Sequence, residues 1–391
     1  MNSEDALIAG RMTRLRNQMA ATNVPAILTA DPINIAYATG ARNMSIYSMM
    51  GAVRFLLVVA DGPAVLWEFP GSEHLADGNP QLDEVRAAPG ITALAGTDYR
   101  DHIAVFAKEV AALCRPHPGS ARLLAVERFD HPVTDELRSS GLELLDGTTT
   151  FAAARMIKTT AEVEVMREAM RRVLEGVEVM RASIVPGKSE IEIWAEFQRH
   201  LIAHEGEYVS TRLVQAGPRT FPYFQEASSA RLGNGDLFSI DTDAIGYGGY
   251  GVDFSRTFLC GSADPTPAQR VLHSMAREQL EHNASQLEVG RSFESFSRSA
   301  WKLPDEFAPY RYSCLAHGLG MSGEHPYVPA IAADGTFSLD GEFEAGMVIC
   351  VESYIGDADT RQGIKLEDQF LVRDDGIERM SETPFDERLS G

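Results

Sequence analysis

The sequence predicts a two-domain protein, in which an α/β domain precedes a larger domain of long helices and of strands that end in acidic residues. Short strands and helices alternate up to about residue 150, as they do in α/β domains. Residues 151–160 mark a change, because long amphipathic helices begin there. We therefore expect a first domain over residues 1–155 and a second over residues 156–391.

The elements of the first domain follow from apolar spacing and from turn residues. Apolar positions at helical spacing, such as Leu7 and Leu15, predict the first helix. Asp31-Pro32 predicts a turn, and residues 40–47 predict a polar loop. The expected elements are a helix at 5–22, a strand at 24–28, a hairpin of strands at 55–60 and 64–69, a helix at 102–114, a strand at 123–126 and a helix at 132–140.

The second domain is expected to begin with two capped helices. Thr159 or Thr160 can cap the first, with Glu162 or Glu164 in its first turn, and this helix ends near residue 184. The second begins at Ser189, and its inward residues are expected to be Ile191, Trp194, Phe197 and Leu201. Further along we expect a strand at 211–216, a turn at 217–220, a helix at 266–288, and strands at 312–320, 347–352 and 364–372.

Residues 237–258 gather three carboxylates where one strand ends and its partner returns. Asp241 and Asp243 should close the first strand on one face, because residues two apart on a strand point the same way. Residues 246–251 predict a hairpin connection, and the returning strand carries Asp253. Converging carboxylates require protons or a cation, and hard divalent metals prefer oxygen ligands. The alternative is that these are turn aspartates that face water.

Three further polar side chains lie within apolar strands. Glu352 ends the apolar run at residues 347–351, and Glu367 follows Leu366 in a second apolar strand. A glutamate in such a strand must be paired. His317 lies beside a glycine in an apolar strand, where a lone histidine is more often a core residue. One histidine and five carboxylates at strand ends of a single domain nevertheless predict a metal site.

Composition argues against several functional classes. The chain has 391 residues, of which 44% are hydrophobic and 23% charged, as in ordinary globular proteins. The formal net charge of -21 disfavours nucleic acid or an anionic membrane as a partner. We find no signal peptide, and no apolar run reaches the roughly 20 residues that span a bilayer. The four cysteines form no CxxC pair and are expected to be reduced, so we predict a cytoplasmic protein.

The pattern of acidic residues and histidine resembles a known family. The set resembles the five-carboxylate, one-histidine dinuclear site of the creatinase, prolidase and methionine aminopeptidase family, the pita-bread fold, and consists of Asp241, Asp243, Asp253, His317, Glu352 and Glu367. The resemblance covers the whole chain. It implies a creatinase-like α/β N-terminal domain, an α+β pita-bread catalytic domain, a homodimer and two divalent metal ions, which iron, manganese, cobalt or zinc would suit.

Within this family the chain looks most similar to the DddP-type dimethylsulfoniopropionate lyase branch. The matching stretches lie at residues 31–39, 43–44, 207–213, 217–226, 238–243, 312–318 and 364–369. The resemblance implies a small zwitterionic carboxylate as the substrate. A base would remove its α-proton while the metal ions hold its carboxylate, so that dimethyl sulfide leaves and acrylate remains.

Two positions depart from the family pattern. Residues 220–223 contain no histidine of the kind that the family's peptidases use to steady the scissile amide. The lyase branch has an aspartate base six residues beyond its metal histidine, where this chain has Gly323. We therefore expect Glu324, one position on, to act as the base, or Tyr312 as a phenolate. The alternative for Glu324 is a rim carboxylate paired with Arg311 or His325.

Two other functions remain open from the sequence. One is metal-assisted hydrolysis of a C–N or amide bond, as in Xaa-Pro dipeptidases or an ectoine hydrolase, with Glu352 shuttling the proton and His325 replacing the absent peptidase histidine. The other is a metal-binding scaffold that recognises a partner without catalysis. The intact ligand set disfavours the scaffold, because an inactive site gains nothing from five buried carboxylates.

Aromatic and basic residues outside the ligand set are candidates for binding the substrate. Arg42, in a polar loop, suits a carboxylate clamp. Tyr47 and Tyr223 could place aromatic faces beside an onium centre, as could Tyr247 and Trp67. Each of these aromatics is, taken alone, more often a packing residue.

Overall fold

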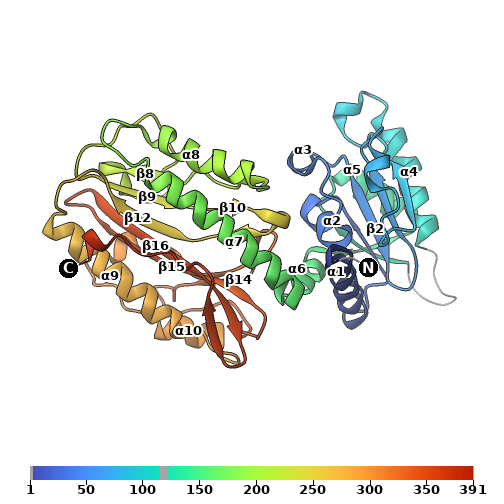
Figure 1. The fold of residues 1–391 in the computed structure, drawn as a ribbon. Coiled ribbons are helices and arrows are strands. Elements are labelled where there is room, and N and C mark those ends of the chain that lie inside the picture. Colours follow the sequence, from blue (N-terminus) through green and yellow to red (C-terminus); the bar gives the residue numbers. More distant parts are fainter. Residues whose placement is uncertain (1–2, 115–121, 391) are drawn as a thin grey trace. The chain divides into compact units, whose positions relative to one another are not determined.

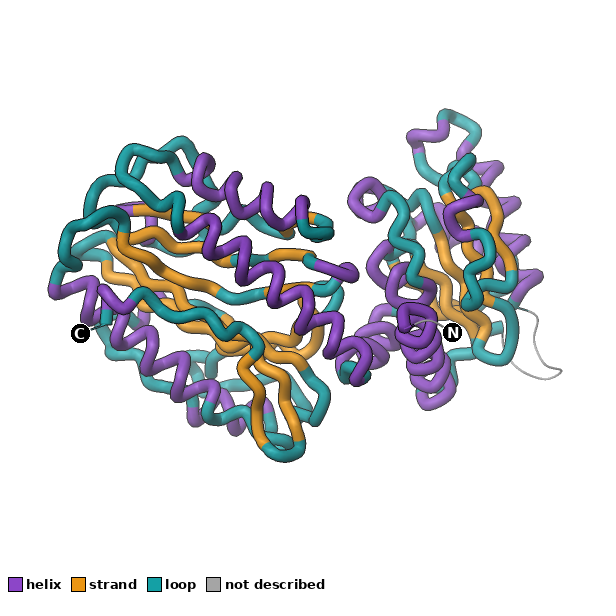
Figure 2. Tube along the Cα trace, viewed as in Figure 1, coloured by secondary structure: helices purple, strands orange, loops and turns teal. Residues whose placement is uncertain are grey.

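The computed structural model describes residues 3–114 and 122–390, and the chain divides into two compact units (Figures 1 and 2). The first unit is Met1–Arg155 and the second is Met156–Gly391. Each unit has its own sheet structure and its own buried core. We describe them separately.

The first unit is built on one six-stranded sheet, in the order β4-β3-β2-β1-β5-β6. Its strands are β1 (Ala26–Thr29), β2 (Phe55–Val59), β3 (Ala64–Glu68), β4 (Glu84–Ala87), β5 (Leu123–Glu127) and β6 (Glu143–Asp146). The β1–β2 and β2–β3 pairs are antiparallel, whereas β1–β5, β3–β4 and β5–β6 are parallel. This mixed sheet is consistent with the predicted hairpin and with the alternation of strands and helices.

Six α-helices alternate along the chain with the strands of this sheet in the described residues. They are α1 (Ser3–Ala21), α2 (Pro32–Thr39), α3 (Ser45–Met50), α4 (Tyr99–Leu113), α5 (His131–Ser139) and α6 (Thr148–Met156). The core of the unit includes Phe55, Trp67 and Phe106, with ring centroids 5.1 and 5.3 Å from Phe106. Trp67 is therefore a core residue, 1% exposed, which is the packing role given above as the more frequent one, and it is not a candidate to bind substrate.

Two local expectations for the first unit were wrong. Asp31-Pro32 opens helix α2 instead of making a turn: the Asp31 carboxylate accepts from Ile33 N and Asn34 N, and Pro32 occupies the first helical position. The expected polar loop at residues 40–47 is interrupted by α3. Proline is tolerated in the first turn of a helix as well as in a loop, so the sequence alone did not distinguish a helix start from a turn at Asp31-Pro32.

The second unit contains three sheets. Their orders are β11-β10-β7, β12-β9-β8 and β14-β13-β15-β16-β17. The strands are β7 (Tyr208–Val209), β8 (Val214–Ala216), β9 (Leu237–Asp241), β10 (Ala244–Ile245), β11 (Gly251–Val252), β12 (Ser255–Leu259), β13 (Cys314–Leu319), β14 (Gly323–Pro329), β15 (Val348–Asp357), β16 (Gln362–Arg373) and β17 (Gly376–Arg379). All recorded pairs in these sheets are antiparallel.

The α-helices of this unit are α7 (Thr160–Arg181), α8 (Glu190–Ala203), α9 (Pro267–Ala284) and the short α10 (Phe293–Ser299). Helices α7 and α8 pack together, and α9 packs on β15 and β16. Short 3₁₀ helices occur in both units. The first unit has η1 (Glu73–Ala76) and η2 (Ala93–Ala95), and the second has η3 (Gly217–Thr220), η4 (Tyr247–Gly249), η5 (Ala308–Tyr310) and η6 (Glu387–Leu389). None of the helices in the described residues is both long and apolar enough to cross a membrane.

Capping at the start of α7 and α8 confirms two predicted helix boundaries. Thr159 accepts from Glu162 N while the Glu162 carboxylate accepts from Thr159 N, and Ser189 and Glu192 form the same box on α8. One predicted inward residue of α8 was wrong, because Ile191 is 42% exposed and Ile193 is buried in its place.

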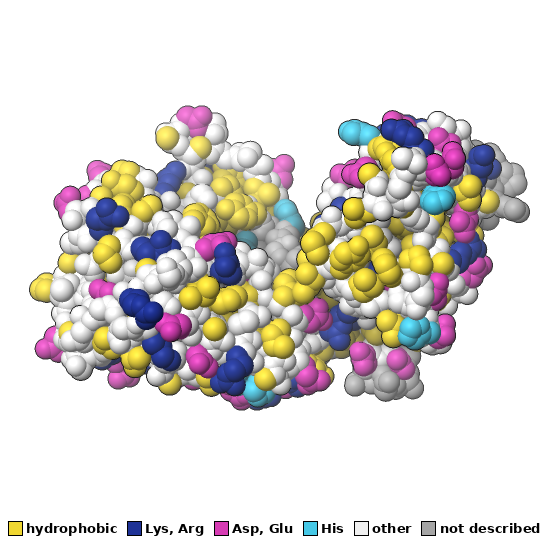
Figure 3. Space-filling view, turned by 90° about the horizontal axis from the view of Figure 1, so that it is seen from above, with side chains coloured by type: hydrophobic (Ala, Val, Ile, Leu, Met, Phe, Trp, Pro, Cys, Tyr) yellow, Lys and Arg dark blue, Asp and Glu magenta, His cyan; other side chains and the backbone are white. Residues whose placement is uncertain are grey.

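Charged side chains of both signs are interspersed on the face of the molecule seen in Figure 3. On α7, Arg171 pairs with Glu168 and Glu175 at helical spacing. A chain of high net negative charge therefore places its basic residues among acidic ones.

Candidate metal centre

The first three predicted ligands lie around the junction of strands β9 to β12. Asp241 is the last residue of β9, and Asp253 lies between β11 and β12. Asp243 follows β9 in a left-handed conformation with φ 39°, so it does not continue the strand as we had expected. The chain turns there, yet carboxylate oxygens of all three aspartates lie within 4.8 Å of one another. The prediction that Asp241 and Asp243 lie close together is therefore confirmed, but its reason, the alternation of side chains along a strand, was wrong.

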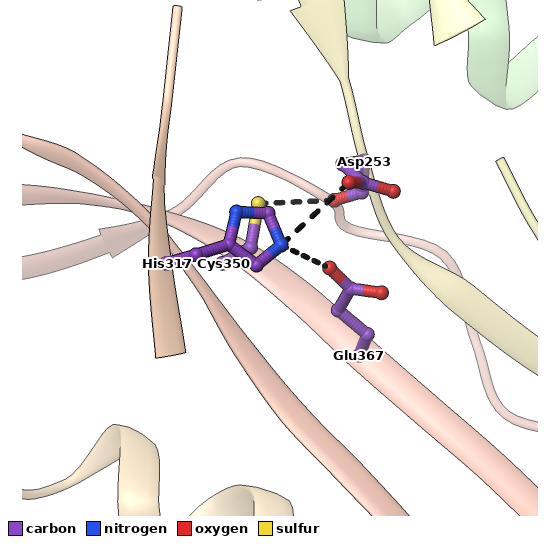
Figure 4. Close-up of side chains that lie close together, drawn as sticks. All are labelled: Asp253, His317, Cys350 and Glu367. Carbon is purple, nitrogen blue, oxygen red and sulfur yellow. Dashed lines mark hydrogen bonds and ion pairs between the residues drawn. The ribbon is translucent and has the colours of Figure 1, made fainter. Parts of the chain in front are cut away.

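The other three predicted ligands come from neighbouring strands of the five-stranded sheet. His317 lies on β13, Glu352 on β15 and Glu367 on β16, where Glu352 is the direct partner of Glu367. The His317 Nε2 atom lies 3.3 Å from Glu352 Oε1. It also lies 3.5 Å from Glu367 Oε1 and 3.7 Å from Asp253 Oδ2, and these two contacts are drawn in Figure 4. The structure therefore brings all six predicted ligands into one cluster. Asp253 belongs to both halves of it.

The orientation of His317 is set by its other ring nitrogen. His317 Nδ1 lies 3.2 Å from the carbonyl oxygen of Gly318, where an N–H can donate. This contact directs Nε2 towards the carboxylates. Burial alone would lower the pKa of His317, but the carboxylates of Glu352 and Glu367 beside Nε2 hold that pKa well above its ordinary value.

A lysine that the sequence argument missed lies at the centre of the cluster. Lys365 Nζ is 2.7 Å from Glu352 Oε2, 2.9 Å from Glu367 Oε2 and 3.4 Å from Asp241 Oδ2. The lysine is fully buried. It therefore binds one oxygen of each of three carboxylates and leaves the other oxygen of each for a different partner.

The remaining carboxylate oxygens fit divalent metal ions. Asp241 Oδ1 and Glu367 Oε1 are buried and have no hydrogen-bond partner within the described chain. Burial first, and the negative charge of Asp241 second, raise the pKa of Asp243 to about 7. Burial and then Glu367 hold the pKa of Asp253 well above its ordinary value. Buried, unpaired carboxylate oxygens beside one imidazole are the donor set that such cations prefer.

Hydroxyl groups around the cluster orient its carboxylates. The Thr211 hydroxyl donates to Asp243 Oδ2, and the Ser255 hydroxyl donates to Glu367 Oε2 at 2.8 Å. The Tyr223 hydroxyl donates to Asp241 Oδ2 at 2.5 Å. Tyr223, predicted to bind substrate, is thus in contact with a predicted ligand, and such partners fix the direction of a ligand oxygen.

An aromatic wall and a cavity adjoin the cluster. The Tyr223 ring lies 5.4 Å from the Tyr312 ring and 5.1 Å from the Tyr354 ring, centroid to centroid. A cavity of about 480 Å³ is lined by Glu352, Tyr312 and Tyr354 among others, with Arg311 also in its wall. A small molecule in this cavity would reach a predicted metal ligand and aromatic faces together.

The predicted catalytic residues after the histidine lie in different surroundings. Glu324, on β14, forms a buried ion pair with Lys158, whose Nζ lies 2.6 Å from Glu324 Oε2. Glu324 Oε1 also accepts from Met321 N at 3.2 Å. His325 is exposed, and its ring lies 5.7 Å from that of Phe293 on α10.

Two predicted substrate residues lie in the first unit. Arg42 and Tyr47 are both exposed, and the Tyr47 ring contacts that of Phe69 edge-on at 6.1 Å. The loop that carries Arg42 is held by Arg54, which donates to the carbonyl oxygens of Ala41 and Asn43. Tyr247, in the second unit, lies under the Arg172 guanidinium at 4.0 Å.

Lys365 and Cys350 could have been found in the sequence. Each stands two residues before a predicted glutamate ligand on the same strand, Lys365 before Glu367 and Cys350 before Glu352. Side chains two apart share one face of a strand. Thr211 gives no such signal, because it reaches Asp243 from a separate segment.

Comparison with known proteins agrees with this site and fold. Residues 164–374 match Metallopeptidase family M24. A dimethylsulfoniopropionate lyase DddP of Roseovarius nubinhibens is 34% identical over 97% of this chain and 87% of its own length. An Xaa-Pro dipeptidase of Pyrococcus furiosus is 26% identical over 59% of this chain and 64% of its own.

A solved structure confirms the predicted fold. The Xaa-Pro dipeptidase of Bacillus anthracis superposes with a TM-score of 0.78 at 20% identity, and the match covers 97% of this chain and 99% of that one. The chain thus has an α/β N-terminal domain and an α+β pita-bread catalytic domain. Taken together, the family match over residues 164–374 and the full-length relative place this chain in metallopeptidase family M24.

Proposed function

We propose that this chain is a metal-dependent lyase that cleaves dimethylsulfoniopropionate, or a closely related zwitterionic carboxylate, to dimethyl sulfide and acrylate. The observation that carries the proposal is the convergence of the six ligands in a chain that is similar to a lyase over nearly its full length. The dipeptidase relative matches a smaller part of the chain.

We assign the six ligands to two divalent ions that share Asp253. Asp241, Asp243 and Asp253 form one group of donors, and Asp253, Glu367 and His317 belong to the other. Glu352 joins the second group through its contact with His317. When bound, iron, manganese, cobalt or zinc ions would supply Lewis acidity towards the substrate carboxylate.

The chain's own residues would hold the remainder of the substrate. Tyr312 and Tyr354 offer aromatic faces to the sulfonium group in the cavity beside Glu352. Burial raises the pKa of Tyr312 far above its ordinary value, which favours a neutral phenol that donates a hydrogen bond over a phenolate base. Arg42 and Tyr47 stay predicted substrate contacts, and the homodimer and the cytoplasmic location stay predictions.

Glu324 remains our proposed base for removal of the α-proton. Lys158 and Met321 N hold its carboxylate in one position on β14, which suits an acceptor that must meet a carbon acid in fixed geometry. His325 contacts Phe293 on α10, so we leave it out of the proposed lyase chemistry.

Hydrolysis of a C–N or amide bond is the second candidate, and membership of a metallopeptidase family is the observation that favours it. The absence of a histidine at residues 220–223 counts against it. In that reaction, Glu352 would shuttle the proton.

One experiment separates these functions. The purified chain, with its metal content measured, is incubated with dimethylsulfoniopropionate, with ectoine-like amides and with Xaa-Pro dipeptides. Headspace gas chromatography detects dimethyl sulfide, and liquid chromatography detects acrylate or free amino acids. Dimethyl sulfide release supports the lyase, and dipeptide or amide cleavage without sulfide supports the hydrolase. A metal-loaded chain inert towards all three contradicts both and favours the scaffold.

Glu324→Gln tests the proposed base within the same assay. This variant keeps the shape of the side chain and its acceptor oxygen but loses the carboxylate. We expect dimethyl sulfide release to fall by a factor of about 100 or more while metal content is unchanged. Wild-type turnover by Glu324→Gln would remove Glu324 from the mechanism without removing the lyase.

A further inference from the structure

Cys350 lies on the face of strand β15 that carries a predicted metal ligand, so packing alone does not account for its position. It lies on β15 directly opposite His317 of β13 and two residues before Glu352, so it shares the face of the sheet that carries the ligands. Figure 4 shows its sulfur beside the His317 ring and Asp253. The side chain is fully buried.

Three other donor atoms converge around this sulfur. Atoms of Cys350, His317, Asp253 and Glu367 all lie within 4.8 Å of one another. Glu367 supplies a second observation: its Oε1 atom is buried and accepts no hydrogen bond in the described residues, and it only faces His317 Nε2 at the longer ion-pair distance of 3.5 Å. The recorded hydrogen bond of the Cys350 thiol is a long one, 3.6 Å to the carbonyl oxygen of Asp253, and thiols are weak donors.

The other cysteine of this sheet is a natural comparison. Cys314, on β13, is also buried, but its thiol donates to the carbonyl oxygen of Ala316 at 3.2 Å, within its own strand. It belongs to neither group of possible metal donors. The two cysteines therefore share burial and sheet but differ in what their sulfur atoms face.

We propose that Cys350 coordinates the cation on the histidine side of the centre, adding one sulfur to its nitrogen and oxygen ligands. Coordination forms a metal–sulfur bond and releases the thiol proton to solvent, with no change of oxidation state. Sulfur favours the softer divalent ions, so the site would prefer zinc, cobalt or iron(II) over manganese and magnesium. The inference rests on the proposed function only in requiring metal at this centre.

Cobalt substitution tests the proposal without reference to activity. The wild-type chain, Cys350→Ser and the matched control Cys314→Ser are loaded with Co²⁺, and cobalt content is measured by elemental analysis. We expect a sulfur-to-cobalt charge-transfer band in the near ultraviolet in the wild type and in Cys314→Ser, and its loss in Cys350→Ser. X-ray absorption of the zinc-loaded wild type should show a sulfur scatterer at about 2.3 Å.

Metal preference provides a second readout. We expect Cys350→Ser to lower the ratio of zinc to manganese affinity by about 10-fold or more, measured by competition titration. Cobalt bound in full to the wild type without the band or the sulfur scatterer overturns the Cys350 assignment and leaves the lyase proposal intact. A wild type that binds no cobalt, zinc, iron or manganese overturns both. If Cys350→Ser does not fold, the absorption data on the wild type still decide.

Discussion

Asp241, Glu352 and Glu367 each give one oxygen to the buried amine of Lys365, and this arrangement shows how single residues make the centre possible. Gathering carboxylates away from water is unfavourable unless positive charge is gathered with them. Their charges in turn hold the pKa of Lys365 well above its ordinary value, against the lowering effect of burial. The amine is therefore a permanent counter-charge within the ligand cluster.

Replacing this lysine should destabilise the metal-free protein. Lys365→Met leaves buried carboxylates without their cation, and we expect the free energy of unfolding to fall by about 3–5 kcal/mol. Urea denaturation in the presence of a chelator measures this change. Lys302→Met, at an exposed lysine, is the control and should change stability by less than about 0.5 kcal/mol. Equal effects of the two substitutions would contradict the counter-charge role.

Asp243 tests the proposed centre directly. Asp243→Ala removes one ligand from the aspartate group, so we expect loss of bound metal and a fall in turnover of at least about 100-fold under the lyase or the hydrolase reading. Elemental analysis and the assay for dimethyl sulfide measure both quantities. Asp264→Ala, at an exposed aspartate, should leave them unchanged. Normal turnover by Asp243→Ala would exclude both enzyme readings.

At the scale of elements, the features that the sequence predicted best are those with local causes. Helices α7 and α8 begin where a hydroxyl residue precedes a glutamate by three positions, and the structure shows both capping boxes. Strands β14 and β17 escaped prediction because they are edge strands, half exposed, without a continuous apolar run. Asp243 was placed beside Asp241 for a geometric reason that the structure does not bear out, because β9 ends first.

The Lys158–Glu324 pair joins the segment before α7 to strand β14. Both side chains are nearly fully buried, so breaking the pair should be costly: we expect Lys158→Met to lower the free energy of unfolding by about 3 kcal/mol. Glu324→Met alone should also destabilise. The double variant should lose clearly less than the sum, because it leaves no buried charge alone. A double-mutant cycle by urea denaturation measures this coupling, and additive losses would contradict it.

At the scale of the whole molecule, pH acts on stability through a buried histidine outside the predicted ligand set. His273, on α9, is 1% exposed, and burial, followed by the positive charge of Arg277, lowers its pKa to about 4. The unfolded chain binds this proton at a pKa of about 6.5. Its contribution to stability is therefore present above about pH 6.5 and is lost as the pH falls towards 4.

Because of this histidine, we expect the free energy of unfolding to fall by about 2 kcal/mol when the pH is lowered from 7 to 5. Urea denaturation at the two pH values, in wild type and in His273→Leu, isolates its share, because other groups titrate alike in both. The loss should be smaller by about that amount in His273→Leu. His74→Leu, at an exposed histidine, should retain the wild-type difference. An unchanged pH dependence in His273→Leu would contradict the assignment.

Long-range convergence limited what could be predicted of the site. In the sequence, the six predicted ligands stand beside or within apolar strand-like runs, where an unpaired charge is unfavourable, and this made them visible. Thr211 and Ser255 hold ligand oxygens through contacts that only the folded chain creates. For Trp67 the sequence left packing and substrate binding both open, because an aromatic residue on a strand looks the same whether it faces a core or a pocket, and the structure shows packing.

The loop that carries the exposed Arg42 is held in place by a buried residue, Arg54. Arg54 is fully buried, forms a two-contact ion pair with Glu68, and binds the carbonyl oxygens on either side of Arg42. Because the backbone at Ala41 and Asn43 is already immobilised in the free protein, a ligand that meets Arg42 need not order the loop first, and its association should be fast. Substitution of Arg54 would therefore loosen the loop at the predicted substrate contact Arg42 while leaving the exposed side chains of the loop unchanged.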